Sequence, residues 1–227
     1  MPADRFYAWS YSRLSDYEAC PLRAKLKHLV KLPDPGNAAM ARGADVHGSI
    51  AKYLSKKTRV PPPEAKLFRK ELGALRILAP KVEEQWGFDG IWKPTDWFGL
   101  TTVARLVLDA YVLNDSSNRF PPTLTIVDFK TGKKRDGYTD QLELYALGGF
   151  AKFPKVSGVT VELWYLDMGP KETERATYGR SSEFEALKLK WAKRVKPMLS
   201  DRRFPPTPGN ACRWCPYSAS KGGPCQF

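Results

Sequence analysis

Apolar residues in the first third of the chain recur every three or four positions, as they do on one face of a helix. Pro21 interrupts the first such stretch, because proline lacks the backbone donor and clashes with the preceding turn. The run Pro61–Pro63 precedes the last stretch and suits the first turn of a helix. The pattern predicts helices over residues 15–30, 38–54 and 64–86, with a proline-containing loop over residues 31–37.

From about residue 100 onward, β-branched and aromatic residues alternate with other residues, which is typical of strands. Helical spacing returns between these stretches, and Ser181 and Ser182 are candidate caps for the last helix. The expected strands span residues 101–113, 123–129, 156–167 and 172–178, and the expected helices span residues 140–150 and 182–199. This alternation predicts an α/β fold with a central mixed sheet flanked by helices, in a single domain over residues 1–227.

Composition narrows the class of protein. Of the 227 residues, 42% are apolar, which is enough for a core and excludes disorder for most of the chain. No apolar run approaches the roughly 20 residues of a membrane span, and the first residues lack the layout of a signal peptide. We therefore expect a soluble, cytoplasmic protein that does not bind membranes. The formal net charge of +13 favours a polyanionic partner such as DNA.

Three candidate catalytic side chains lie on two neighbouring predicted strands. Alternation places Asp128 and Lys130 on one face, roughly 7 Å apart along the backbone, and Asp109 lies opposite them if the strands pair. Two convergent carboxylates suit Mg²⁺ or Mn²⁺, and a lysine beside them stabilises charge that develops on a phosphoryl group. An isolated D-x-K triplet more often marks an ordinary strand end. The hypothesis of phosphodiester chemistry therefore depends on the residues around it.

Further residues support this hypothesis. Gln141 and Tyr145 stand four positions apart on the predicted helix that follows, so they share one face of it. His47 is a candidate ligand for Mn²⁺, although a histidine on a helix is more often structural. Basic residues follow the second strand directly, and the candidates for DNA contact among them are Lys133, Lys134 and Arg135.

The chain has four cysteines, Cys20, Cys212, Cys215 and Cys225, and three of them fall within the last sixteen residues. That terminal segment is rich in proline and poor in apolar residues, so it needs a staple to fold. In a reducing compartment, four thiolates that include a C-x2-C pair suit zinc or an iron–sulfur cluster better than two disulfides. Residues 1–30 and 201–227 are therefore predicted to be cluster-binding segments of the same domain.

Taken together, these motifs resemble the RecB-like branch of the PD-(D/E)XK nuclease superfamily. They are Ser12-x-Leu14-Ser15-x-Tyr17-x-x-Cys20-Pro21, Gly43-x-x-x-His47, Asp109, Asp128-Phe129-Lys130-Thr131-Gly132, Gln141-Leu142-x-x-Tyr145, and Cys212-x-x-Cys215-Pro216 with Cys225. The cysteine motifs are similar to those of the iron–sulfur members of that branch, the AddB nucleases and the CRISPR-associated adaptation exonucleases. The resemblance spans nearly the whole chain.

The resemblance implies a restriction-endonuclease-like core and a DNA nuclease that depends on Mg²⁺ or Mn²⁺. It also favours a 4Fe–4S cluster over structural zinc at the four cysteines. The implied roles are metal binding for His47, Asp109, Asp128 and the carbonyl of Phe129, catalysis for Lys130, and shaping of the site and DNA contact for Gln141 and Tyr145. Relatives often carry an acidic residue near the positions of Glu83 and Glu84, which we assign here to the surface of the predicted helix over residues 64–86.

Three functions remain in competition. The leading hypothesis is a metal-dependent DNA exonuclease in recombination, repair or phage DNA processing, working with a separate helicase or recombinase. The second is an endonuclease specific for single strands or for particular DNA structures. The third is a non-catalytic DNA-binding module with a four-cysteine metal site. Convergent acids next to a lysine argue against the third, because a protein that only binds phosphate gains nothing from nearby carboxylates.

Overall fold

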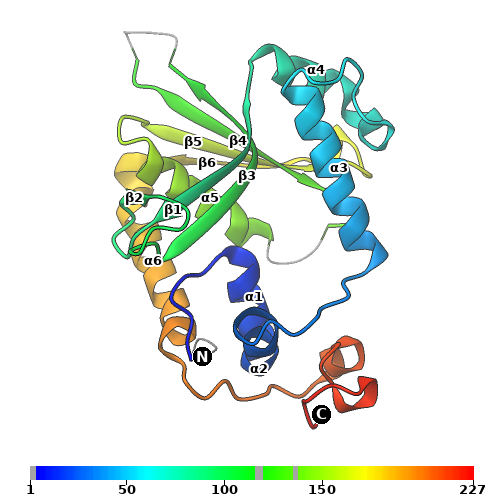
Figure 1. Ribbon diagram of the computed structural model, residues 1–227. Coiled ribbons are helices and arrows are strands. Elements are labelled where there is room, and N and C mark those ends of the chain that lie inside the picture. The colour runs from blue at the N-terminus through cyan, green and yellow to red at the C-terminus, as the bar shows by residue number, and fades with distance from the viewer. Residues whose placement is uncertain (1–3, 116–119, 135–137) are drawn as a thin grey trace.

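The computed structural model describes residues 4–115, 120–134 and 138–227. A six-stranded sheet forms its centre, with helices on both faces (Figure 1). The strands are β1 (Lys81–Phe88), β2 (Pro94–Thr95), β3 (Ala104–Asn114), β4 (Thr123–Lys130), β5 (Gly158–Tyr165) and β6 (Glu174–Gly179). The α-helices are α1 (Tyr11–Ala19), α2 (Pro21–Ala24), α3 (Ala38–Leu54), α4 (Arg69–Ile77), α5 (Tyr138–Lys152) and α6 (Arg180–Ser200).

Shorter helical turns complete the described part of the chain. A π-helical turn follows α2, and 3₁₀ turns lie before α4, before β6 and in the C-terminal segment. Their bounds are Lys25–Leu29, Pro63–Phe68, Pro170–Glu172, Asn210–Trp214 and Ala219–Lys221. None of the helices in the described ranges is long and apolar enough to cross a membrane.

The sheet is mixed, as expected, and its strand order is β2-β1-β3-β4-β5-β6. The strands pair antiparallel except for β4 and β5, which are parallel and are joined through α5. A parallel pair needs such a crossover, because the chain must return to the same end of the sheet. The crossover carries α5 back across the sheet beside β4, and this brings its side chains over the end of that strand.

Each face of the sheet has its own hydrophobic core. Alternate residues of β4 point to opposite faces, so Leu124 and Ile126 pack on the α5 and α6 side, while Val127 and Phe129 pack on the α3 and α4 side. Helix α5 lies very close to the first face. A Cβ on Gly148 would come within 2.6 Å of a Leu106 methyl carbon, so only glycine permits this approach.

Both ends of the chain attach to the same part of the fold. Trp9 forms a parallel bridge to Ala104 at the start of β3, and its ring stacks on Trp191 of α6 at 5.7 Å. The C-terminal segment returns past α1 and α2 (Figure 1), where the Tyr17 hydroxyl donates to Asp201 Oδ2 at 2.8 Å and the Tyr217 hydroxyl donates to the carbonyl oxygen of Leu32 at 3.3 Å. The N-terminal and C-terminal segments therefore lie close together, as the sequence predicted.

Two sequence predictions near the first strand were wrong. The helix expected over residues 64–86 ends at Ile77, and residues 81–88 form β1 instead. Pro80 explains the break, because the residue before a proline is driven out of the helical region, and Ala79 has a φ of 50°. Glu83 and Glu84 accordingly lie on a strand and not on a helix surface. The first helix also begins earlier than expected, at Tyr11, where the Ser10 side chain caps it.

Candidate active site

Asp109 and Asp128 are neighbours across two central strands. Ala110 of β3 pairs with Val127 of β4, and the next residues along this antiparallel register are Asp109 and Asp128. Both carboxylates are largely buried, with 9% and 3% of their surface exposed. Such burial is costly for a charged group, so each carboxylate needs strong local partners.

Asp109 is held by a side chain from α3 and by the backbone of β4. His47 Nδ1 lies 3.1 Å from Asp109 Oδ1, and the Phe129 amide donates to Asp109 Oδ2 at 2.7 Å. Burial opposes protonation of the His47 imidazole, but the hydrogen bond with Asp109 and the charges of Asp109 and Asp128 together outweigh burial, so the pKa of His47 is raised. His47 on α3 is therefore part of the polar network around Asp109. Phe129 provides its N–H to the site while its ring packs in the adjacent core.

Asp128 has three polar neighbours. The Tyr145 hydroxyl and Gln141 Nε2 lie 2.8 and 3.3 Å from Asp128 Oδ1, and Lys130 Nζ lies 2.6 Å from Asp128 Oδ2. Burial raises the pKa of Asp128, and the charge of Lys130 limits this increase. Burial and the charge of Asp128 also raise the pKa of Tyr145 well above its usual range, so its phenol stays protonated and acts as a donor.

Gln141 connects the lysine to the rest of this network. Its Oε1 accepts from Lys130 Nζ at 2.8 Å, and its Nε2 donates to the Tyr145 hydroxyl at 2.8 Å. The spacing of four residues on α5 places both side chains toward β4, as the sequence indicated. The lysine ammonium is further stabilised by the ring of Tyr138, at 4.7 Å from its centroid.

The predicted side chains meet at one open pocket of about 500 Å³. Its lining includes the six side chains His47, Asp109, Asp128, Lys130, Gln141 and Tyr145. The donor set of carboxylate oxygens and imidazole suits a hard divalent cation. Asp128 Oδ2 is also buried and, among the described residues, accepts no hydrogen bond of good geometry despite the nearby lysine. In those residues, however, no group of three or more His, Cys, Asp or Glu side chains is arranged to hold a metal ion.

Glu83 is a site residue that the sequence pattern missed. The pairing of β1 with β3 keeps one register from Val82–Ala110 to Glu84–Leu108, so Glu83 lies opposite Asp109, where it interrupts the ladder with a φ of 51°. Burial and the charge of Asp109 raise the pKa of Glu83. Pro80 directly before this segment, and the aromatic residues Trp86 and Phe88 two positions apart, were the signals of a strand at this position.

The three basic candidates for DNA contact have different surroundings. Lys133 is exposed. Lys134 lies 3.1 Å from Glu172 and 3.6 Å from Glu174, so two carboxylates already compensate its charge. Arg135 lies outside the described residues.

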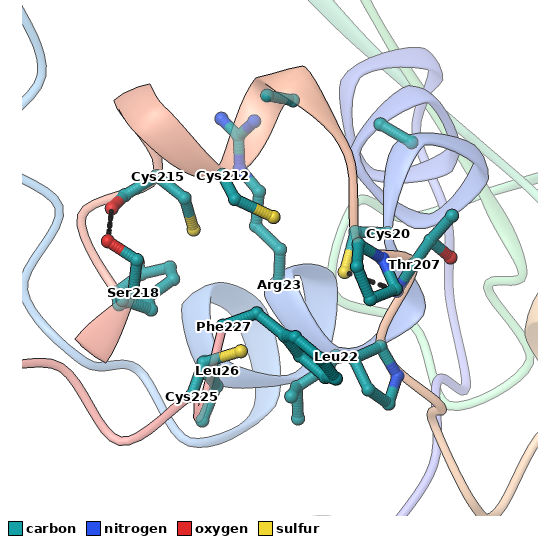
Figure 2. A pocket seen from close by; sticks show the side chains of 15 residues that line it. Cys20, Leu22, Arg23, Leu26, Thr207, Cys212, Cys215, Ser218, Cys225 and Phe227 are labelled. Atoms are coloured by element: carbon teal, nitrogen blue, oxygen red, sulfur yellow. Dashed lines mark hydrogen bonds between the residues drawn. The ribbon is translucent and has the colours of Figure 1, made fainter. Parts of the chain in front are cut away.

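The four cysteines line a single small hollow of about 40 Å³. Figure 2 shows Cys20, at the junction of α1 and α2, facing Cys212, Cys215 and Cys225 of the C-terminal segment. All four are free thiols and are partly exposed. The Thr207 amide donates to Cys20 Sγ at 3.4 Å, which ties the returning segment to this cysteine. The four cysteines that the sequence predicts to share a metal therefore line one hollow. Within residues 4–115, 120–134 and 138–227, however, they do not form a group arranged to hold a metal ion.

A comparison with protein-family profiles identifies the sequence family of this chain. A profile described as the PD-(D/E)XK nuclease superfamily matches residues 8–98 and 108–220, and these segments contain the six side chains that line the pocket. No curated protein matches the chain by sequence.

Several solved structures are similar to the chain, among them the following two. The crystal structure of SSO0001 is 10% identical, with a TM-score of 0.43, and the match covers 99% of this chain and 89% of that one. The crystal structure of a "Putative exonuclease" from Eubacterium rectale is 12% identical, with a TM-score of 0.48, and covers 93% and 88% respectively.

Proposed function

The chain belongs to the PD-(D/E)XK nuclease superfamily, and from this premise we propose that it is a DNA exonuclease of the RecB-like branch that requires Mg²⁺ or Mn²⁺. The observation that carries the proposal is the convergence of Asp109, Asp128 and Lys130 on one pocket, with Gln141 bonded to the lysine. A protein that only binds DNA has no need for buried acids beside a phosphate.

In the proposed reaction, water attacks a phosphodiester of DNA and the strand is cut into a phosphate end and a hydroxyl end. Asp109 and Asp128 would hold a divalent cation, which would supply Lewis-acid activation at the scissile phosphate. Lys130 places its ammonium beside the phosphoryl oxygens, where negative charge increases in the transition state. Gln141 fixes the position of that ammonium through the 2.8 Å hydrogen bond.

The remaining site residues act through these groups. His47 orients Asp109 and is the candidate third ligand, together with the carbonyl of Phe129. Tyr145 donates to Asp128 Oδ1, and the other oxygen, Oδ2, lies 2.6 Å from the ammonium of Lys130. The proposed roles of Gln141 and Tyr145 include contact with the DNA backbone, and Lys133, Lys134 and Arg135 extend the basic surface beyond β4.

A 4Fe–4S cluster bound by Cys20, Cys212, Cys215 and Cys225 is the second part of the proposal. It is supported by the convergence of cysteines from both ends of the chain on one hollow (Figure 2). Four thiolates also suit structural zinc, which is the alternative. In either case the metal links segment 1–30 to segment 201–227 within one domain, and closing so long a loop lowers the entropy of the unfolded chain.

The test of the exonuclease assignment compares linear and circular DNA, each single- and double-stranded and uniformly labelled, with Mg²⁺ or with Mn²⁺. Degradation of linear DNA with circles left intact supports an exonuclease. Cutting of single-stranded circles or of one particular DNA structure favours the endonuclease alternative. Tight binding without hydrolysis under any of these conditions favours the non-catalytic module.

A further inference from the structure

The active-site pocket extends beyond the carboxylates to a second group of residues. Its far wall contains Arg13 from α1, Arg105 from β3, and the aromatic residues Trp97 and Phe98 from the loop after β2. Arg105 and Asp109 stand four residues apart on the same strand, which separates them by roughly 13 Å. The arginines therefore face the same pocket as the catalytic residues, at a distance from the scissile position.

The fold brings the two arginines together through a long-range pairing. Trp9 bridges to Ala104, the Trp9 amide donates to the Val103 carbonyl at 2.8 Å, and the Arg105 amide donates to the Trp9 carbonyl at 2.9 Å. This fixes the residues before α1 along the start of β3. Arg13, in the first turn of α1, is consequently held near Arg105.

The arginines lack the acidic partners that a purely structural pair would have. In the described part of the chain, neither guanidinium forms an ion pair with a carboxylate, and Arg105 Nε is buried with no hydrogen-bond partner. Burial, followed by the charge of Arg105, lowers the pKa of Arg13. Two like charges held close together in a partly buried place repel each other, and an anion between them removes that cost.

Two further features of the wall favour a nucleotide phosphate as the anion. Ser10 and Ser12, at the N-terminal end of α1, also line the pocket, and this end of a helix carries partial positive charge. The Arg105 guanidinium lies 5.6 Å from the centroid of the Trp97 ring and 5.4 Å from that of Phe98. Phe98 is 83% exposed, so its ring is available to stack against a base.

We propose that Arg13 and Arg105 form a phosphate-binding subsite for the DNA strand, and that a base of the same strand stacks on Phe98. The subsite holds a phosphate other than the one being cut, because it lies away from the carboxylates. This inference rests on the proposed nuclease function. It specifies how the DNA strand is positioned in the pocket. Two sources supply the same phosphate chemistry: a terminal phosphate on a DNA end, or an internal phosphodiester.

The test measures DNA binding in a Lys130→Ala background, so that cleavage does not intervene. Arg13→Gln and Arg105→Gln are compared with Arg69→Gln, which removes the same charge from an exposed position on α4 outside the pocket. The probes are four single-stranded DNAs: a linear strand with a 5′-phosphate, the same strand with a 3′-phosphate, one with hydroxyl ends, and a circle. We expect each pocket variant to weaken binding about tenfold relative to Arg69→Gln.

The probes separate the two sources of phosphate. Weakening confined to a strand with one type of terminal phosphate identifies an end-binding subsite, and equal weakening on all four probes, including the circle, identifies an internal one. Phe98→Ala should weaken binding in both cases without changing the melting temperature, because its ring is exposed. The subsite is refuted if both pocket variants fold normally and bind every probe as well as Arg69→Gln does. Hydrolysis by the protein with Lys130 intact is measured separately, so failure of the nuclease function is distinguishable from failure of the subsite.

Discussion

Lys130 Nζ lies 2.6 Å from Asp128 Oδ2, and both side chains come from the last three residues of β4. Asp128 is buried and Lys130 is largely buried, so each charge depends on the other for its stability. Because Gln141 also binds the ammonium, the lysine is restrained from two sides. A divalent cation at the carboxylates would compete with Lys130 for Asp128 and direct the ammonium toward the substrate.

Glu83→Gln should alter metal dependence without abolishing activity. Removing the negative charge opposite Asp109 relieves repulsion in the metal-free protein, so we expect a slightly higher melting temperature in EDTA. The same change weakens the attraction for a cation, so half-maximal activity should need several-fold more Mg²⁺. Glu84→Gln is the matched control on the neighbouring position of β1. If the two variants need the same Mg²⁺ concentration for half-maximal activity, Glu83 does not contribute to the metal site.

Asp16 should make the stability of the N-terminal helices depend on pH. Burial raises its pKa, but the hydrogen bond with His28 and the charge of Lys27 outweigh burial and leave the pKa lowered. A lowered pKa in the folded state stabilises the protein above the unfolded value of about 3.9, and this contribution is lost as pH falls through the folded value.

Asp16→Asn should therefore lower the melting temperature at pH 7, by an amount equivalent to roughly 1–3 kcal/mol, and have less effect near pH 3. Asp45→Asn, at an exposed position on α3, serves as the control. A loss of stability from Asp16→Asn that is the same at both pH values would contradict the assignment.

DNA affinity should fall steeply with salt, because contacts between basic side chains and phosphates release counterions. Lys133→Ala should flatten the plot of log K against log salt by about one unit if it contacts a phosphate. Lys134→Ala should change the slope less, because Glu172 and Glu174 already compensate its charge. Lys155→Ala, at an exposed position after α5, is the control. If the slope of log K against log salt is the same in all three variants, the DNA does not contact the surface around Lys133 and Lys134.

Protein purified anaerobically should be brown and contain about four irons per chain if the cluster is the cubane type. Cys20→Ser should lower metal content and melting temperature as much as Cys212→Ser, since Cys20 is the proposed ligand that would join the first helices to the C-terminal segment. Stoichiometric zinc without iron after iron-replete expression would contradict the iron–sulfur cluster and indicate structural zinc at the same cysteines. Full metal content and an unchanged melting temperature in Cys20→Ser would show that no metal bound by Cys20 links the two terminal segments.

The sequence predicted the parts of the site that depend on local spacing. Asp128 and Lys130 follow the alternation of one strand, and Gln141 and Tyr145 follow one turn of a helix, so neither relationship requires knowledge of the fold. Glu83 was assigned wrongly because its segment continues the helical spacing before it, and only the break at Pro80 and the pairing of β1 with β3 reveal its position.

Arg13 and Arg105 gave no sequence signal at all. They are distant in the chain, and their proximity depends on the bridge between Trp9 and Ala104, which is a tertiary contact. Local propensity contains no information about such a pairing. The four cysteines are the opposite case, since their residue type and scarcity indicated a shared site despite their separation.

The most direct measurement is the rate of hydrolysis of linear DNA by Lys130→Ala in the presence of Mg²⁺ or Mn²⁺, compared with the unmodified protein and with Lys133→Ala. The account predicts that Lys130→Ala slows hydrolysis by about a hundredfold or more, since it removes the charge that stabilises the transition state, while DNA affinity stays within about twofold. Lys133→Ala should retain the rate at saturating DNA. Unchanged hydrolysis by a correctly folded Lys130→Ala protein would contradict the assignment of this site.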